Sequence, residues 1–206
     1  LLVETIAAVR AATGPGFPIL VRLDAHEYRI EGGIRLEDCV AMARLCERAG
    51  AHAIDVSAYG NVAHSIAFTE APLVHEPGGF ISFAEAVKHA VSIPVIAVGR
   101  IEPDVAERAI AAGDFDFLAM GRKLLADPDL PRKLAAGHEK SVLPCIYCYI
   151  CVSQIFINKP VCCAVNHNTG REHESDLLAR SGAPQKILVV GGGPGGMECA
   201  RLLSGQ

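Results

Sequence analysis

The stretch IPVIAVGRIEPDVAERAIAAGDFDFLAMGR (93–122) decides the fold class, because it contains a complete strand–helix–strand unit. An apolar strand over 93–99 is followed by a helix over 102–113, and a second apolar strand over 115–120 comes directly after it. Short strands that alternate with amphipathic helices at this spacing are typical of a parallel sheet. This unit therefore predicts an α/β fold.

The same alternation extends toward the N-terminus. The run FPILVRL (17–23) is continuously apolar and contains β-branched residues, as in a strand that is buried on both faces. Further helices and one more strand surround it, so the sequence predicts four strands in all. These further elements are helices over 1–12, 36–49 and 83–91 and a strand over 51–58.

An open, doubly wound sheet and a (β/α)8 barrel both fit this order. The strand ends favour the barrel, because polar residues and glycines gather on the carboxyl side of each strand, where barrel enzymes assemble their sites. Since only four strands are visible, we expect the C-terminal half of a TIM barrel. A half-barrel exposes apolar edges, so the piece is expected to be unstable and inactive by itself. The strand-end residues are Arg22, Asp24, Ser57, Tyr59, Gly60, Gly99, Arg100, Gly121 and Arg122.

The composition is that of a globular protein that acts on small molecules. The 206 residues are 50% hydrophobic and carry a net charge of −4 without a basic block, which argues against a nucleic-acid partner. No apolar run reaches the roughly 18 residues of a membrane span. The first residues, LLVETIAAVRAATG (1–14), lack the layout of a signal peptide, so we expect a cytoplasmic protein and an internal piece of a longer chain. Homo-oligomerisation stays open.

Five of the eight cysteines fall within the short segment 145–163. Cys145, Cys148 and Cys151 are separated by two residues each, and the pair Cys162-Cys163 follows. Thiolates at this spacing can wrap one face of a metal centre that a more distant cysteine closes. A [4Fe–4S] cluster, a structural zinc site and redox-active or buried thiols are the alternatives, and the apolar residues around the thiols favour the cluster. Spacing alone does not choose between Cys162 and Cys163. The other three cysteines, Cys39, Cys46 and Cys199, lie in helical patterns and are expected to be small core residues.

A glycine-rich turn follows the apolar run KILVV (186–190) and precedes a helix. Gly191 permits the tight turn, Gly193 lets a pyrophosphate approach the backbone, and Gly196 allows close packing of the helix. The helix N-terminus then faces the phosphates. This arrangement predicts the first βα unit of a Rossmann-like dinucleotide-binding domain, in which FAD and NAD(P) are not distinguished.

Gly99-Arg100 and Gly121-Arg122 stand at consecutive strand ends. Loops after the last two strands of a barrel commonly bind phosphate, where glycine permits close approach and arginine adds a charge-assisted contact. Either arginine could instead cap a turn or pair with a carboxylate. Arg22 is a partner either for a carboxylate such as Asp24 or for an electron-rich ring.

Catalytic candidates are weaker than these cofactor sites. Tyr59 and His64 follow a strand and could face a substrate, but neither has a catalytic partner that the sequence identifies. The predicted organisation is a half-barrel over 1–140, a cluster segment over 141–172, a linker over 173–185 and the start of a dinucleotide domain over 186–206.

In this order, the motifs VRLD (21–24), IPVIAVGRI (93–101), PCIYCYICVSQIF (144–156), CAVN (163–166) and KILVVGGGPGGMECA (186–200) resemble a known family. It is the old yellow enzyme-like NADH:flavin oxidoreductases with three domains, which include 2,4-dienoyl-CoA reductase, enoate reductases and trimethylamine dehydrogenase. The resemblance implies FMN, a [4Fe–4S] cluster, FAD and NAD(P)H as cofactors. It also implies an electron relay from NAD(P)H through the cluster to FMN, which reduces an activated C=C bond; in an amine dehydrogenase the flow is reversed. A zinc-stabilised barrel that binds a phosphorylated ligand without redox activity is the alternative from another class.

The resemblance also assigns roles to residues of this chain. Arg22 is similar to the strand arginine beside the FMN ring, where its charge would stabilise the anionic reduced flavin. The two Gly-Arg pairs resemble the cradle of the FMN phosphate. Cys145, Cys148 and Cys151 resemble the first three cluster ligands, and the CAVN context implies Cys163 as the fourth. Tyr149 and His167 depart from the pattern, which leaves the subgroup and the substrate open.

Overall fold

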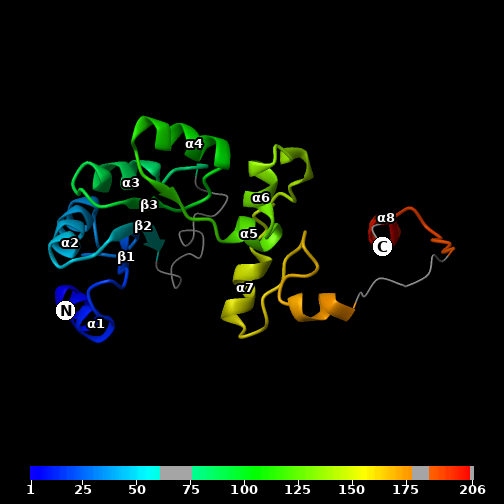
Figure 1. Ribbon diagram of the computed structural model, residues 1–206, viewed down its shortest axis with the longest axis horizontal. Helices are drawn as coiled ribbons and strands as arrows, with labels where there is room; N and C mark the ends of the chain where they lie inside the picture. The colour runs from blue at the N-terminus through cyan, green and yellow to red at the C-terminus, as the bar shows by residue number, and fades with distance from the viewer. Residues whose placement is uncertain (61–75, 178–185, 205–206) are drawn as a thin grey trace.

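The computed structural model describes residues 1–60, 76–177 and 186–204 of the chain. Within these ranges four parallel strands form one sheet in the sequential order β1-β2-β3-β4 (Figure 1). The predicted α/β fold with a parallel sheet is confirmed. The strands are β1 (Leu20–Tyr28), β2 (Ala53–Gly60), β3 (Val95–Ala97) and β4 (Phe117–Leu118).

Helices α2, α3 and α4 pack against β1, β3 and β4, and Figure 1 shows them on the same side of the sheet. A sequential strand order with its helices on one side is the winding of a barrel, whereas a doubly wound sheet reverses its order. The helices up to this point are α1 (Leu2–Thr13), α2 (Leu36–Arg48), α3 (Ile81–Lys88) and α4 (Pro103–Ala112).

Shorter helices follow the sheet. They are α5 (Arg122–Ala126), α6 (Leu130–Ala135), η2 (Glu139–Ser141), α7 (Ile150–Phe156), η3 (Glu172–Leu177) and α8 (Pro194–Ser204). In the part of the chain that the structure describes, no helix combines the length and apolarity that crossing a bilayer would need.

Local sequence explains where the predicted helices begin and end. Helix α4 has Pro103 in its first turn, and Gly113 ends it in the left-handed conformation with φ 88°. Proline suits the first turn because its missing N–H would have no helical partner, and glycine suits the left-handed position because it has no Cβ. At the start of α2 the Arg35 amide donates to the Asp38 carboxylate at 2.9 Å.

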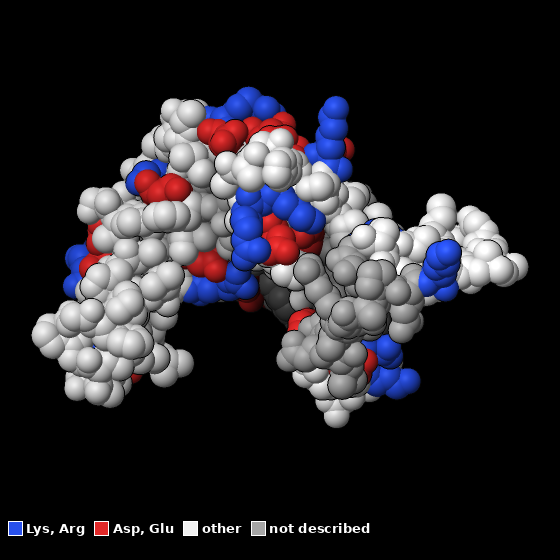
Figure 2. All heavy atoms as spheres, turned by 45° about the vertical axis from the view of Figure 1, so that its right-hand side comes forward, with Lys and Arg blue, Asp and Glu red and all other residues white. Residues whose placement is uncertain are grey.

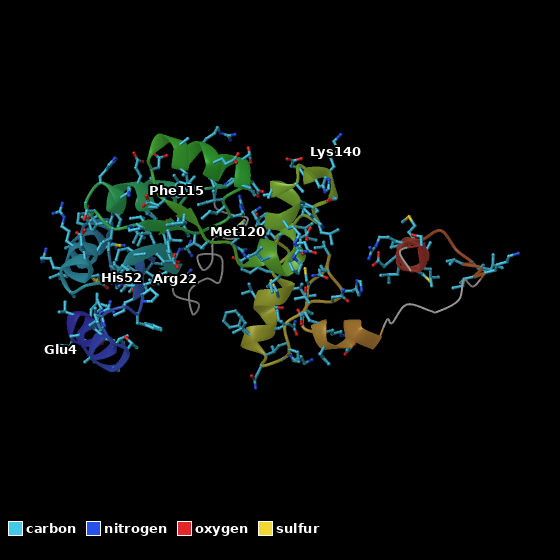
Figure 3. The ribbon with its side chains drawn as sticks, in the orientation of Figure 1. Glu4, Arg22, His52, Phe115, Met120 and Lys140 are labelled. Carbon is cyan, nitrogen blue, oxygen red and sulfur yellow. The ribbon has the colours of Figure 1, made fainter. Side chains whose placement is uncertain are left out.

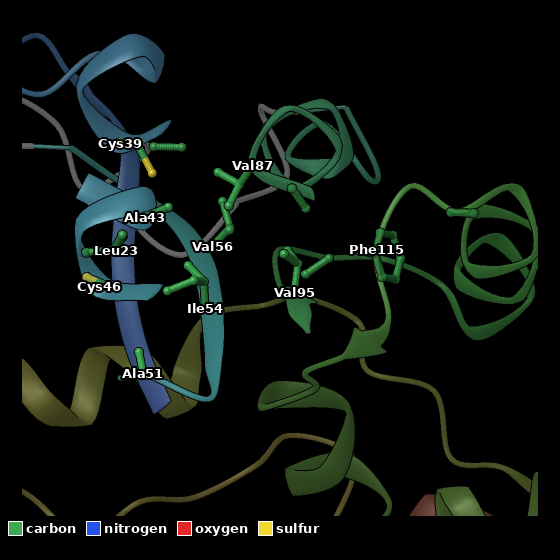
Figure 4. Packing of buried hydrophobic residues seen from close by; sticks show 14 of the residues in the cluster. Leu23, Cys39, Ala43, Cys46, Ala51, Ile54, Val56, Val87, Val95 and Phe115 are labelled. Atoms are coloured by element: carbon green, nitrogen blue, oxygen red, sulfur yellow. The ribbon is translucent and has the colours of Figure 1, made fainter. Parts of the chain in front are cut away.

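The core lies between the sheet and the helices (Figure 4). Ile54 and Val56 of β2 are fully buried there, together with Cys39 and Cys46 of α2, as predicted for these two cysteines. Because successive side chains of a strand point to opposite faces, Asp55 lies on the face away from these helices. The alternation of apolar and polar residues along β2 therefore determines which polar side chains lie on the face of the sheet opposite the helices.

Two strand predictions need correction. Strand β1 begins at Leu20 rather than at residue 17 and continues to Tyr28, because β2 pairs with it as far as Tyr28–Gly60, past a bulge after Asp24. The prediction that this strand is buried on both faces is wrong in part, since Leu20 is exposed.

The run 186–190 is not a strand in this structure. Leu188 and Val190 are 86% and 87% exposed, and a β-strand forms only where a neighbouring strand satisfies its backbone groups. Helix α8 does form, but Cys199 within it is exposed rather than a core residue. The predicted βα unit therefore shows its helix without its strand.

Candidate cofactor site

A pocket of about 350 Å³ opens at the carboxyl ends of the strands. The loops after β3 and β4 contribute to it, whereas β1 and β2 contribute Arg22 and Ser57, which lie within their strands and not at the strand ends that the sequence predicted. Figure 3 labels Arg22 and Met120, which line it from β1 and from the loop after β4. The lining consists of Arg22, Ser57, Phe80, Val98, Gly99, Arg100, Ile101, Ala119, Met120, Gly121, Arg122, Lys123 and Tyr147.

The loop after β3 turns sharply at Gly99 and Arg100. Gly99 has φ 113°, and a Cβ at this position would lie 2.5 Å from Cδ2 of Phe80. Arg100 is itself left-handed, with φ 48°. An L-residue at Gly99 would therefore be strained and would collide with Phe80. The glycine lets the backbone turn so that Arg100 lines the pocket.

The loop after β4 uses its glycine differently. Gly121 has φ −94°, which any residue can adopt, and a Cβ there would meet no atom of the described chain within 4 Å. Its missing side chain leaves open space in the pocket wall. That space suits a ligand that approaches the backbone closely, such as a phosphate beside Arg122.

Arg22 pairs with Asp55 and not with Asp24. Its Nε and Nη2 atoms both lie 2.7 Å from Oδ2 of Asp55. The strand register places these two residues side by side on β1 and β2, whereas Asp24 lies two residues, or roughly 6.6 Å, further along β1. Burial, and then the neighbouring Glu27, raise the pKa of Asp24. The pairing orients the guanidinium while its side chain stays 58% exposed at the pocket.

Tyr147, which no sequence motif pointed to as a site residue, forms one wall of the pocket. Its ring lies 5.5 Å from the guanidinium carbon of Arg100, 5.3 Å from that of Arg122 and 5.2 Å from Nζ of Lys123. Its hydroxyl donates to Oε1 of Glu102 at 2.9 Å, and Lys123 pairs with Oε2 of the same carboxylate. Burial, together with the bond to Glu102, raises the pKa of Tyr147. The only sequence signal for this role is the pair of tyrosines inside the cysteine motif.

Acidic and basic side chains alternate over the surface around these elements. Figure 2 shows them interspersed on the visible face, in agreement with the absence of a basic block from the sequence. The positive charge at the pocket is therefore local. It suits a small anionic group better than a long polyanion.

The cysteine segment is held to the sheet domain, but its thiols do not form a metal site in the described part of the chain. Across residues 1–60, 76–177 and 186–204, no three His, Cys, Asp or Glu side chains lie where they could hold a metal ion. Cys148 is exposed, whereas Cys145, Cys151 and Cys163 are half-buried, as is Cys162. The thiols suit iron chemically, but their placement does not fit a cluster. Thiols attract one another weakly, and metal binding supplies the free energy that gathers them.

Two side chains after the last cysteines anchor this segment to α5. Asn166 donates from its side-chain amide to the Leu125 carbonyl oxygen at 2.9 Å, and the Thr169 hydroxyl donates to the same oxygen at 2.8 Å. A carbonyl near the end of a short helix has no partner within the helix, so these bonds satisfy it. They fix the CAVN stretch beside the loop that follows β4.

The glycine-rich turn is closely packed at two of its three predicted glycines. Gly191 has φ 109°, and a Cβ at Gly196 would overlap the carbonyl oxygen of Gly191. A Cβ at Gly193 would meet nothing within 4 Å. Two glycines are thus required by the turn itself, and the third leaves room beside the start of α8.

The side chains of the two catalytic candidates lie outside the described part of the chain. The backbone of Tyr59 belongs to β2, but its side chain is outside the described part of the chain. His64 lies within 61–75 and is also outside the described residues.

Comparison with known proteins gives concordant matches. The profile of the NADH:flavin oxidoreductase / NADH oxidase family matches residues 1–141. A metal reductase from Desulforamulus reducens is 39% identical over 201 residues, which cover 97% of this chain and 29% of the relative. An NADH oxidase from Thermoanaerobacter brockii is 40% identical over 200 residues, which cover 96% of this chain and 30% of the relative. The chain thus spans about three tenths of the length of these curated relatives.

Solved structures share the fold. A 2-naphthoyl-CoA reductase in complex with 2-naphthoyl-CoA is similar with a TM-score of 0.86 at 32% identity, over 98% of this chain and 31% of that one. A histamine dehydrogenase from Rhizobium sp. 4-9 is similar with a TM-score of 0.78 at 26% identity, over 98% of this chain and 29% of that one. The α/β fold with its parallel sheet is therefore similar to that of TIM-barrel oxidoreductases.

Proposed function

The chain belongs to the NADH:flavin oxidoreductase / NADH oxidase family of flavin-dependent enzymes, and we propose that its pocket binds FMN at the carboxyl end of a half-barrel. The pocket is the observation that carries this proposal. Two glycine-containing loops and four cationic side chains line it, and the space beside Gly121 suits a phosphate. Residues 1–140 would be the C-terminal half of the (β/α)8 barrel.

Each group in the pocket has a role that follows from its chemistry. Gly121 would let the phosphate reach the backbone, and Gly99 permits the turn that brings Arg100 to the pocket. Arg100 and Arg122 would neutralise the charge of the phosphate. Arg22, which lines the pocket from β1, would face the flavin ring. Bound FMN supplies the hydride and single-electron chemistry that amino-acid side chains do not provide.

Asp55 would act on the ring through Arg22. Its Oδ2 accepts from both Nε and Nη2, so the guanidinium plane is fixed relative to the sheet. A fixed cation at the ring stabilises negative charge that develops there without having to reorganise during the reaction. The exposed part of Arg22 keeps that charge available to a ligand.

We propose NAD(P)H-dependent reduction of an activated C=C bond, of the enoate or dienoyl-CoA type, as the activity of the whole protein. The similarity to an NADH oxidase and to a 2-naphthoyl-CoA reductase supports this direction. Gly191, Gly193 and Gly196 would bind the pyrophosphate of FAD or NAD(P). A [4Fe–4S] cluster on Cys145, Cys148 and Cys151 is proposed from the cysteine spacing, and Cys163 is proposed as its fourth ligand from the resemblance of the CAVN stretch. The cluster takes part in no step proposed for the pocket, because no three of these thiols lie where they could hold a metal ion in the described part of the chain.

Amine oxidation is the second candidate, and the similarity to a histamine dehydrogenase supports it. The fold serves both directions of electron flow, so the substrate must be tested directly. The two activities differ in which reagent reduces the flavin.

The experiment uses the full-length gene product, purified without air. We expect visible flavin absorption, release of FMN on denaturation, bleaching by NADH and reoxidation by an enoate or enoyl-CoA ester. Bleaching by an amine, but not by NADH, would support the second candidate instead. A colourless protein that contains zinc and neither flavin nor iron would contradict both.

A further inference from the structure

Tyr147 and Tyr149 both adopt a backbone conformation that is unusual for their residue type. Their φ values are 52° and 65°, in the left-handed region. Residues with a Cβ rarely occupy this region, because the Cβ crowds the neighbouring carbonyl oxygen. A residue persists there only where its surroundings compensate for the strain. The contacts of the Tyr147 side chain provide such compensation.

Tyr147 joins the cysteine segment to both loops of the pocket. Arg100 and Glu102 belong to the loop after β3, and Arg122 and Lys123 follow β4. The ring contacts the three cations of these loops, while the hydroxyl bonds to the carboxylate that also binds Lys123. One side chain from the motif Cys145-Ile-Tyr-Cys148 thus touches every charged group on this side of the pocket.

Contact with the ring is compatible with an anion in the pocket. An arginine that stacks on an aromatic ring uses the face of its guanidinium, and its N–H donors still point outward in the plane. The ring therefore restricts the orientation of Arg100 and Arg122 without replacing an anionic ligand. A ligand that binds prearranged cations loses less free energy in ordering them.

We propose that Tyr147 is a positioning residue that couples phosphate binding in the pocket to the docking of the cysteine segment 145–151. This inference rests on the proposed binding of FMN, because the phosphate of the flavin is the ligand. The coupling is reciprocal: a docked Tyr147 raises the affinity for the phosphate, and a bound phosphate holds the cysteine segment in place by the same factor. The position of the thiols thereby depends on whether the flavin site is filled.

The test compares FMN with riboflavin, which has the same ring and lacks the phosphate. Affinities are measured by titration of the full-length apoprotein, for the wild type and for Tyr147→Leu. We expect Tyr147→Leu to weaken FMN binding about five- to tenfold, in the lower range of coupling between sites, and to change riboflavin binding less than about twofold. Hydrogen–deuterium exchange provides the second readout. Adding FMN should slow the exchange of amides 145–151 in the wild type but not in the variant.

Two further variants separate the ring from the strain and from the hydroxyl. Tyr147→Gly relieves the left-handed strain, so it should fold well and still lose FMN affinity as Tyr147→Leu does. Tyr147→Phe keeps the ring over the cations and should retain FMN affinity to within about threefold, since it loses one hydrogen bond.

The outcomes distinguish this inference from the proposed function. A wild-type protein that does not bind FMN would overturn both. If the wild type binds FMN and Tyr147→Gly binds it equally well, the proposed function stands and the coupling is refuted. An equal loss of FMN and riboflavin affinity in Tyr147→Leu would also refute it, because the effect would then not act through the phosphate.

Discussion

The two pocket glycines should respond differently to replacement by alanine: Gly99→Ala should lower the stability of the protein, and Gly121→Ala should lower its affinity for FMN. Gly99→Ala puts a Cβ 2.5 Å from the Phe80 ring at φ 113°, a conformation that costs an L-residue about 1–3 kcal/mol. Gly121→Ala has an ordinary φ of −94° and meets nothing within 4 Å, so it should leave stability unchanged or raise it by about 0.4–1 kcal/mol.

FMN binding should be weakened by Gly121→Ala, the substitution that the stability of the protein tolerates. The new methyl group at Gly121→Ala would occupy the space through which we propose that the phosphate approaches the backbone. Loss of one hydrogen bond to a charged oxygen costs about 1.5–3 kcal/mol, which corresponds to roughly a 10- to 100-fold weaker affinity for FMN. Riboflavin should bind to this variant nearly as it does to the wild type.

Urea unfolding of the full-length apoprotein and titration with FMN measure the two effects separately. Gly113→Ala, at the C-terminal end of α4, is the matched control for Gly99→Ala. It also replaces a left-handed glycine, with φ 88°, but Gly113 does not line the pocket. It should lower stability and leave FMN affinity intact. Wild-type FMN affinity in a folded Gly121→Ala protein would refute the assignment of the phosphate to this loop.

Three further predictions concern other parts of the chain. Asp55→Asn should destabilise the protein by about 1–2 kcal/mol, because Arg22 loses a charged and largely buried partner. The loss is moderate because Arg22 itself is more than half exposed. A change below about 0.5 kcal/mol in urea unfolding would contradict this. Burial alone would raise the pKa of Asp127, but its bonds to a lysine and to backbone amides hold the pKa below the ordinary value. The ionised Asp127 therefore stabilises the folded protein above the unfolded pKa of about 3.9, and this stabilisation is lost as the pH falls through the lower folded pKa. Asp127→Asn should thus destabilise the protein at pH 7 and not at pH 2, which thermal unfolding followed by circular dichroism measures. If a cluster forms as the spacing suggests, Cys163→Ala should lose iron and Cys162→Ala should keep it; iron analysis that gave the reverse would reassign the fourth ligand.

Local periodicity was sufficient for most of the secondary structure. The helices from α1 to α4 occur where their apolar patterns and terminal residues predict them, because helix formation depends on residues three and four positions apart and on the caps. The run 186–190 shows the limit of this reasoning. Its apolar, β-branched residues suit a strand, but a strand also needs a neighbour to bond with, which the described part of the chain does not provide.

The sequence by itself determined the α/β class, the order of the strands and the two Gly-Arg pairs at the pocket, but not the end of β1 or the presence of Tyr147 in the pocket wall. Only the tertiary structure decided which residues pair: Arg22 with Asp55, 33 positions away, and Tyr147 with Glu102, 45 positions away. The physical reason is that strand register and loop packing depend on contacts between distant segments, which no local pattern encodes. The cysteines differ from these pairs: their spacing suggests a metal centre, but metal binding supplies the free energy that would gather the thiols.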